Sequence, residues 1–195
     1  MSIARVQYSV FAARKGKTLT CAGCRQPIEK GTKYAWFKVG FRSRFVHTYH
    51  VGCSIPDSVR ESSMMSGVMA ARETAQADIA AYTDPATLVA DIESTLESCA
   101  EEWRSVGEQY AEAADAMGAA GEPMQEVADS IETAADELTS WQPDEDEPDP
   151  DHDDGHDGEQ ADCDECQSTI DEWVDAVKES AVSAIDDAES NIESL

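Results

Sequence analysis

Positive charge is almost absent from residues 61–195 of this 195-residue sequence. This part contains three cationic side chains, Arg72, Arg104 and Lys178, against 39 carboxylates, and its formal charge is −36. Residues 1–60 contain eleven Lys or Arg against two carboxylates and carry a formal charge of +9. Because phosphates are attracted by a basic surface and repelled by an acidic one, only the N-terminal part is suited to contact nucleic acid. The split also predicts two separately folded parts.

Long apolar runs are missing as well. No stretch approaches the eighteen or more apolar residues of a membrane span, and the N-terminus has no apolar signal core. We therefore expect a cytoplasmic protein without membrane contact. Four of the six cysteines form two Cys-x-x-Cys pairs, and this spacing is typical of metal ligands. The cysteines therefore favour metal binding in a reducing compartment over a disulfide framework.

Motifs of catalysis are also missing. The sequence contains no recognisable nucleophile with its base, no Gly-rich phosphate loop and no metal-ligand set with an open position. The carboxylates are too numerous for any pair of them to be singled out. We therefore expect a protein that is not an enzyme.

One ligand set does stand out, at the two ends of residues 21–53. The segment opens with Cys-x-x-Cys and closes with His-x-x-Cys. Cys21, Cys24, His50 and Cys53 supply three thiolates and one imidazole, a common tetrahedral set for structural zinc. All four positions would be filled by protein, which leaves none for a catalytic water. We expect one zinc ion per chain in a basic Cys3His module.

His47 is an alternative imidazole ligand. His47, His50 and Cys53 are evenly spaced by three residues, so spacing alone does not choose between the two histidines. We prefer His50 because its distance from Cys53 repeats that of the first cysteine pair. His47 would then be a packed or hydrogen-bonded strand residue.

A β-hairpin is predicted between the two ligand pairs. The stretches KYAWFKV and RSRFVHTYH are rich in aromatic and β-branched residues, and Gly40 between them offers a turn. Tyr34 and Trp36 would share one face of the first strand, with Ala35 and Phe37 on the other face.

The cations on or beside this hairpin predict a surface that contacts phosphates, with an aromatic side chain that could stack on a base. No side chain in it indicates readout of a particular sequence. In the competing interpretation, Trp36, Phe37 and Phe45 are a small core and the cations only keep it soluble. The candidate nucleic-acid-binding residues are Lys30, Lys33, Lys38, Arg42, Arg44 and Trp36.

The segment CAGCRQPIEKGTKYA, followed by TYHVGC, resembles the zinc finger of poly(ADP-ribose) polymerases and DNA ligase. That finger begins with Cys-x-x-Cys, continues with an Ile-x-Lys-Gly turn, and ends with an aromatic residue followed by His-x-Gly-Cys. The resemblance covers residues 21–53 and implies zinc bound by the three cysteines and the histidine, and recognition of DNA ends and nicks. The matching residues are Cys21, Cys24, Ile28, Lys30, Gly31, Tyr49, His50, Gly52 and Cys53.

A second resemblance concerns the order of the parts. A small basic module (AARKGK, IEKGTKYAWFK), a Ser- and Met-rich helix and acidic helices (AEEWRSVGEQYAEAADAM, ELTSW) are similar to uncharacterised proteins encoded by tailed bacteriophages. This resemblance implies a viral origin and a place in the host cytoplasm. It implies no activity.

The rest of the chain is predicted to be mainly helical, because apolar residues recur at steps of three and four from Leu88 to Met117, Met124 to Trp141 and Cys166 to Leu195. The expected fold class is α+β, with a small zinc-stapled β-hairpin module followed by a mainly α acidic helical bundle or antiparallel coiled coil. The predicted segments are the basic Cys3His module at 1–56, a connecting helix at 57–82, an acidic helical hairpin at 84–141, a disordered acidic linker at 142–162 and a third acidic helix at 163–195.

A second metal site is conceivable at the end of the linker. His152, His156, Cys163 and Cys166 follow the pattern His-x3-His-x6-Cys-x2-Cys. Burial is a competing explanation, because Cys166 falls on the apolar seam of the third acidic helix, as Cys99 does on that of the first.

These features predict a non-enzymatic, zinc-dependent nucleic-acid-binding protein, with DNA as the expected partner. Its acidic helices would serve in self-association or in docking a protein partner. The alternative is a protein-interaction or inhibitor module with purely structural zinc, whose acidic surface could imitate DNA. A third possibility is that the acidic part pairs with the basic part and competes with nucleic acid.

Overall fold

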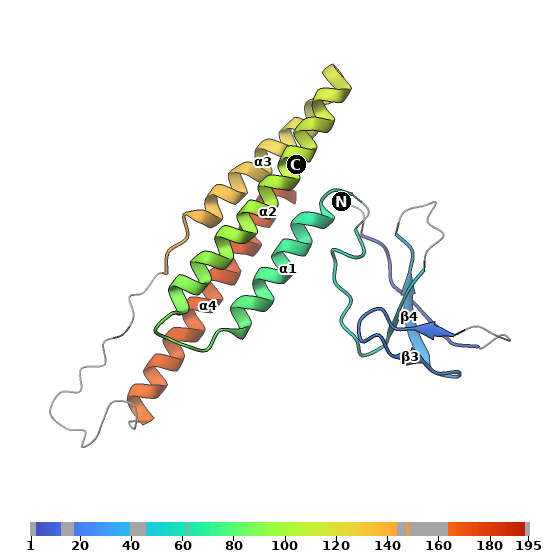
Figure 1. Ribbon diagram of the computed structural model, residues 1–195, viewed down its shortest axis with the longest axis horizontal. Coiled ribbons are helices and arrows are strands. Elements are labelled where there is room, and N and C mark those ends of the chain that lie inside the picture. The colour runs from blue at the N-terminus through green and yellow to red at the C-terminus, as the bar shows by residue number, and fades with distance from the viewer. Residues whose placement is uncertain are drawn as a thin grey trace. The chain divides into compact units, whose positions relative to one another are not determined.

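The computed structural model describes residues 3–12, 18–39, 46–61, 63–143, 148 and 164–193, with the side chains of 164–166 and 193 excepted. It divides into two compact units, Met1–Glu73 and Thr74–Leu195. Short β-strands and the Cys3His cluster lie in the first unit, and a mainly α region of four helices follows (Figure 1). The predicted α+β fold class is confirmed.

The first unit contains two small antiparallel sheets. The larger sheet has the strand order β1-β4-β5, so β4 is central, and β2 and β3 form the smaller sheet. The predicted hairpin corresponds to β4 and β5, in which Phe37 lies opposite His47 and Tyr34 lies opposite His50. The strands are β1 (Gln7–Val10), β2 (Leu19–Thr20), β3 (Pro27–Ile28), β4 (Lys33–Phe37) and β5 (His47–His50).

The core of this unit is small and follows from strand alternation. Ala35 and Phe37 point to one face of β4 and are buried, whereas Tyr34 and Trp36 on the other face are half-buried. The Phe37 ring stacks on that of Tyr49, with centroids 5.9 Å apart. The buried cluster consists of Phe11, Cys21, Ile28, Ala35, Phe37 and Tyr49.

The helix that follows the metal module is shorter than the predicted 57–82, since α1 covers Ser66–Ala81. The backbone N–H groups of Asp57 and Ser58 donate to the Glu73 carboxylate, at 2.6 and 3.3 Å. Arg60 also pairs with Asp57 at 2.7 Å. The Arg60 N–H donates to the Asp57 carbonyl at 2.9 Å, so residues 57–60 form a turn ahead of α1.

The second unit is built from long helices, namely α2 (Leu88–Met117), α3 (Glu122–Thr139) and α4 (Asp164–Glu193), with a short 3-10 turn η1 (Gly118–Ala120) between α2 and α3. Helices α2 and α3 form a hairpin with an extensive interface, and α4 packs along both of them (Figure 1). Two hydrogen bonds join the preceding segment to these helices: one runs from Gln76 in α1 to Asp186, and the other lies between Tyr82, which follows α1, and Thr95.

The predicted apolar seams are the buried faces of these helices. In α2 the seam is buried from Leu88 to Tyr110, with Trp103 fully covered. It then departs from the prediction, because Ala114 is buried in place of Ala113, and Met117 is 54% exposed. The seams of α3 and α4 are buried at Ile131, Ala134, Leu138, Trp173, Val177, Ala181, Ile185, Ala188 and Ile192.

The connection between α2 and α3 depends on two glycines. Gly118 ends α2 with φ +59°, a conformation that favours glycine. Gly121 lies so close to α2 that a Cβ atom there would be 2.2 Å from the Ala114 carbonyl oxygen. The absence of a side chain therefore lets the chain turn back directly against the end of α2.

Among the described helices, none combines the length and the apolar character that a membrane span requires.

Candidate metal centre and nucleic-acid interface

The first cysteine pair lies in the turn between β2 and β3. The N–H of Arg25 donates to the Cys21 carbonyl at 2.9 Å, and the N–H of Cys21 donates to the Gln26 carbonyl at the same distance. Arg25 takes a positive φ of 60° to close this turn. The turn holds the backbone so that the thiols of Cys21 and Cys24 converge on one side.

The second pair lies where β5 ends. His50 is the last residue of β5, and the N–H of Cys53 donates to its carbonyl at 3.0 Å. Thr48 in β5 joins the two pairs: its carbonyl accepts from the Ala22 N–H at 2.7 Å, and its hydroxyl donates to the Thr20 carbonyl at 2.7 Å. The sheet thus places the second pair beside the first.

The four candidate ligands form one compact cluster, which could hold a metal ion. One ligand atom from each of Cys21, Cys24, His50 and Cys53 lies within 4.8 Å of all the others. The sulfurs of Cys21 and Cys53 are 3.7 Å apart, and Cys24 Sγ is 3.2 Å from His50 Nδ1. A tetrahedral ion with metal–sulfur bonds of about 2.3 Å requires sulfurs roughly 3.8 Å apart, which the first distance matches.

The surroundings of the cluster favour the charged form of one thiol. Burial alone raises the pKa of Cys21, but hydrogen bonds from the backbone of Cys24 and His50 outweigh it and lower this pKa to about 6. One of these donors is the His50 N–H, 3.3 Å from Cys21 Sγ. The hydrogen bond to Cys21, followed by burial, raises the pKa of Cys53 to about 11. A thiolate is thus present at neutral pH, as metal binding requires.

His47 lies outside this cluster. Its ring stacks on Phe37, with centroids 5.0 Å apart and an interplanar angle of 5°. Since His50 is three positions further along β5, the two side chains point to opposite faces of the sheet. The ring nitrogen that faces the cluster is Nδ1 of His50.

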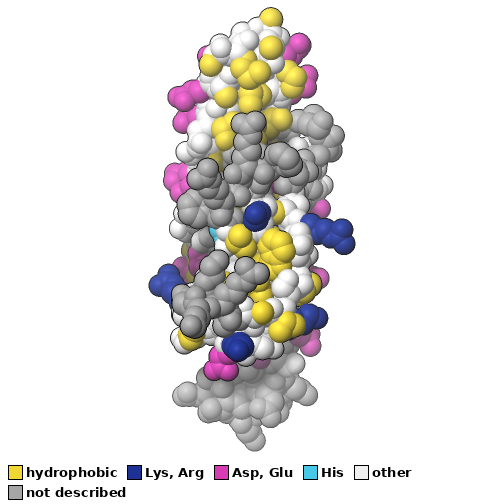
Figure 2. All heavy atoms as spheres, turned by 90° about the vertical axis from the view of Figure 1, so that its right-hand side faces the viewer, with side chains coloured by type: hydrophobic (Ala, Val, Ile, Leu, Met, Phe, Trp, Pro, Cys, Tyr) yellow, Lys and Arg dark blue, Asp and Glu magenta, His cyan; other side chains and the backbone are white. Residues whose placement is uncertain are grey.

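The structure describes part of the predicted basic face. Lys30, Lys33 and Lys38 are exposed, whereas Trp36 is half-buried and its indole N–H donates to the Ser9 hydroxyl at 2.9 Å. Arg42 and Arg44 lie outside the described residues. Figure 2 shows hydrophobic side chains in the middle of one face, with Lys and Arg side chains around them.

Sequence reasoning missed a second aromatic residue on this unit. Tyr8 in β1 is 58% exposed, and the ammonium of Lys33 lies 5.3 Å from the centroid of its ring. The neighbouring Val10 is 62% exposed. The alternation in QYSV could have indicated a strand, but only the sheet order shows that this strand is an edge.

The possible second metal site is not described. His152, His156 and Cys163 lie outside the described residues, as does the side chain of Cys166. In the part of the chain that the structure describes, the one group of metal-ligating side chains is the Cys3His cluster. Cys99 is buried in α2, as the seam predicted.

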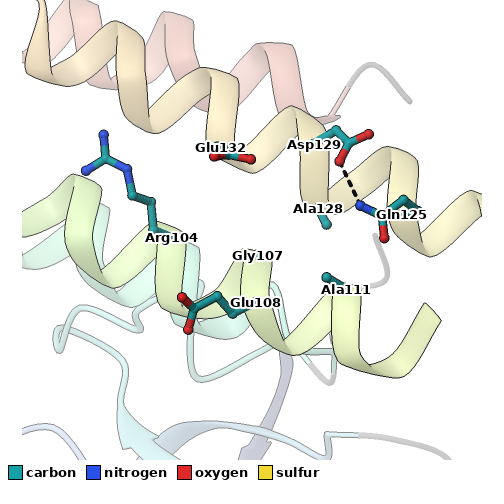
Figure 3. Close-up of a pocket in the computed structure, with 8 residues that line it drawn as sticks. All are labelled: Arg104, Gly107, Glu108, Ala111, Gln125, Ala128, Asp129 and Glu132. Atoms are coloured by element: carbon teal, nitrogen blue, oxygen red, sulfur yellow. Dashed lines mark hydrogen bonds between the residues drawn. The ribbon is translucent and has the colours of Figure 1, made fainter. Parts of the chain in front are cut away.

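A shallow pocket lies between α2 and α3 (Figure 3). Its base is formed by the small residues Gly107, Ala111 and Ala128, and its cation, Arg104, is paired with Asp136 at 2.8 Å. The rest of its lining is polar or acidic: Glu108, Gln125, Asp129 and Glu132.

Comparisons with protein families, with curated proteins and with solved structures find no match for this chain, so the functional argument rests on the residues themselves.

Proposed function

We propose that the N-terminal unit binds one structural zinc ion and, in its folded zinc-bound form, binds nucleic acid through its basic face without enzymatic activity. The observation that carries the proposal is the convergence of Cys21, Cys24, His50 and Cys53 from two turns onto one point. Three thiolates and an imidazole favour zinc over the harder cations, which prefer oxygen ligands.

A structural role for zinc follows from the size of the core. Among the described residues of this unit, the hydrophobic cluster contains six buried side chains, a small core for a loop-rich segment of this length. Zinc binding contributes about 10 to 16 kcal/mol to the folding of small zinc-finger peptides. Since four protein ligands complete the tetrahedron, the ion has no position for a substrate or a reacting water.

Unpaired cations support the binding of nucleic acid. Among the residues that the structure describes, five cations of this unit are exposed and have no carboxylate partner: Arg5, Arg25, Lys30, Lys33 and Lys38. Such cations release counterions from a phosphate backbone, which favours binding at low salt. The resemblance of residues 21–53 to the finger of poly(ADP-ribose) polymerases and DNA ligase supports DNA as the partner.

The zinc part of the proposal is tested by metal analysis of the purified full-length protein. We expect one zinc per chain, and loss of that zinc in the Cys24→Ser variant. Two zinc ions per chain would support the second site at Cys163 and Cys166, whereas a metal-free protein that keeps its fold would contradict a structural role.

The binding part is tested with labelled DNA at 50 and 200 mM salt. The pair Lys33→Gln/Lys38→Gln removes two cations from the basic face, and Arg104→Gln/Lys178→Gln is its matched control, since it changes the net charge equally but in the helical unit. We expect the first pair to weaken binding and the control pair to leave it unchanged. Absence of binding by the zinc-loaded protein at 50 mM salt would refute nucleic-acid binding, and equal losses in both pairs would refute the assigned face.

A further inference from the structure

Strand β1 exposes an apolar surface at one edge of the three-stranded sheet. Tyr8 lies opposite Ala35 and Val10 lies opposite Lys33, and directly opposed residues of antiparallel strands share a face. Tyr8 and Val10 are the most exposed large hydrophobic side chains among the described residues. Their exposure is local, because Ala35 and Phe37 on the same face are covered.

Among the described aromatic residues of this unit, Tyr8 has the most exposed side chain. Trp36 lies on the other face, where its indole N–H is held by Ser9. Phe37 and Tyr49 are buried in the core and stack on each other. An exposed tyrosine at the sheet edge presents one ring face that the fold does not cover.

Two cations lie near this ring. Lys33 lies 5.3 Å from the ring centroid, within the range of a cation–π contact. Arg5 and Tyr8 line the same shallow hollow, together with Val6 and Gln7. Neither Lys33 nor Arg5 has a carboxylate partner in the described ranges. An exposed aromatic ring with unpaired cations near it matches an unpaired base and its neighbouring phosphates.

We propose that Tyr8, with Lys33 and Arg5, forms a base-stacking subsite for single-stranded nucleic acid. This inference rests on the proposed nucleic-acid binding and names its substrate class. The interior of a duplex cannot use the subsite, because its bases are already stacked on one another, and only the terminal base pairs of a blunt duplex have a free face. Bases of a single strand are free to stack on the ring, and this adds to phosphate contacts that both forms share.

The test uses the zinc-loaded full-length protein with a labelled mixed-sequence single strand and a closed circular duplex that contains the same sequence and has no terminal base pair. We expect tighter binding of the single strand. Tyr8→Ala should weaken single-strand binding by about 5- to 100-fold and leave duplex binding unchanged. Tyr8→Phe, which keeps the ring, should bind as the original protein does. Val51→Ala removes an exposed apolar side chain after β5 and is the matched control.

The outcomes separate this inference from the proposed function. If neither nucleic acid binds, the proposed function fails. If both bind but Tyr8→Ala weakens neither, the proposed function stands and the stacking subsite is refuted. If the Tyr8→Ala variant loses zinc, the Tyr8→Leu variant is used in its place, since leucine keeps the apolar contact but lacks a ring. The subsite is also refuted if Tyr8→Ala abolishes concentration-dependent self-association and leaves single-strand binding intact, because β1 then pairs with a second copy.

Discussion

His50 reaches the metal cluster because of its position in β5. It is the last strand residue, it lies opposite Tyr34, and its backbone N–H donates to Cys21 Sγ. His47 enters the same strand three residues earlier and stacks on Phe37. Two histidines with equivalent spacing therefore have different surroundings, one polar and rich in sulfur, the other aromatic.

The two histidines should respond differently to substitution. His50→Ala should weaken zinc binding by more than about 100-fold, because even partners outside the ligand set contribute roughly 10- to 100-fold. His47→Ala should keep zinc and lower thermal stability, since it removes a stacked ring from Phe37. Competition with a chromogenic chelator measures the first effect and thermal unfolding of the zinc-loaded protein the second. Equal zinc affinity of the two variants would contradict the assignment.

The ligand types could be predicted from spacing, because two residues between ligands let one turn present both. The preference for His50 rested on the same repeated spacing and agrees with the cluster. Its physical reason, the face of β5 that meets the first cysteine pair, could not be predicted from the sequence. Tyr8 was missed for a related reason. Its exposure follows from the place of β1 at the sheet edge, and strand order depends on pairings between residues far apart in the sequence.

Cys99 should make the stability of the helical unit depend on alkaline pH. Burial, with the nearby carboxylates of Glu189 and Glu102, raises its pKa from the ordinary 9.0 to about 12. A raised pKa means that the fold favours the neutral thiol. Its contribution is therefore complete below pH 9 and is lost as the pH rises from 9 to 12.

Urea unfolding at pH 7.5 and 10 of the original protein and of Cys99→Ala measures this effect. The difference in unfolding free energy between the two proteins should fall by about 1 kcal/mol at pH 10, since groups common to both cancel. A difference that is constant with pH would show that the thiol ionises equally easily in the folded and unfolded chain.

At the scale of elements, the turn between α2 and α3 decides where the apolar seam of α2 ends. The chain turns back at Gly121 against Ala114, so residues beyond Ala114 lie past the point where α3 covers α2. This explains why Ala114 is buried and Met117 is exposed. Periodicity predicted the buried faces of the three helices, but not this end, since the position of the turn is a property of the packed pair.

Gly121 in the connection and Gly107 in α2 should respond differently to substitution by alanine. Gly121→Ala places a Cβ atom 2.2 Å from the Ala114 carbonyl oxygen and should destabilise the protein by about 1 to 3 kcal/mol. Gly107 lies inside α2, and Gly107→Ala places the Cβ atom 3.4 Å from Cγ2 of Ile131 in α3. This substitution should be neutral or stabilising, because alanine favours a helix. Chemical denaturation measures both. Equal effects would contradict the close approach at Gly121.

Helix α1 starts at Ser66, later than the sequence pattern predicted. The turn that precedes it is held by Glu73, which accepts hydrogen bonds from the backbone of Asp57 and Ser58. The sequence placed the helix start near Pro56 because proline is common in a first turn. Capture of backbone donors by a carboxylate sixteen residues away has no local signal.

At the scale of the whole molecule, we expect salt to affect the basic residues 1–60 and the acidic residues 61–195 in different ways. The exposed surface of α2 carries Glu93, Glu97 and Glu101 at steps of four, each near the next on the same helix face. Cations near them are few, because residues 61–195 contain only three. Repulsion among these carboxylates therefore opposes the packing that the apolar seams favour.

Added salt should stabilise the helices and weaken nucleic-acid binding in the same protein. Raising NaCl from 20 to 500 mM screens repulsion between carboxylates, since the Debye length falls from roughly 20 Å to about 4 Å. We expect the melting temperature of the helical circular dichroism signal to rise, and DNA affinity to fall. A melting temperature that falls with salt would show that ion pairs outweigh repulsion.

The ligands of the Cys3His cluster differ in their exposure to solvent, and this difference would affect how long the proposed zinc ion stays bound. Cys21 is fully buried, whereas Cys24 is exposed. A chelator or an oxidant would therefore meet Cys24 first, and the ion would leave by release of one ligand at a time from that side. If the cluster holds a structural zinc ion, as we propose, the time for which the unit keeps its fold after zinc becomes scarce is governed by the opening of one surface thiol, and not by the equilibrium affinity of all four ligands.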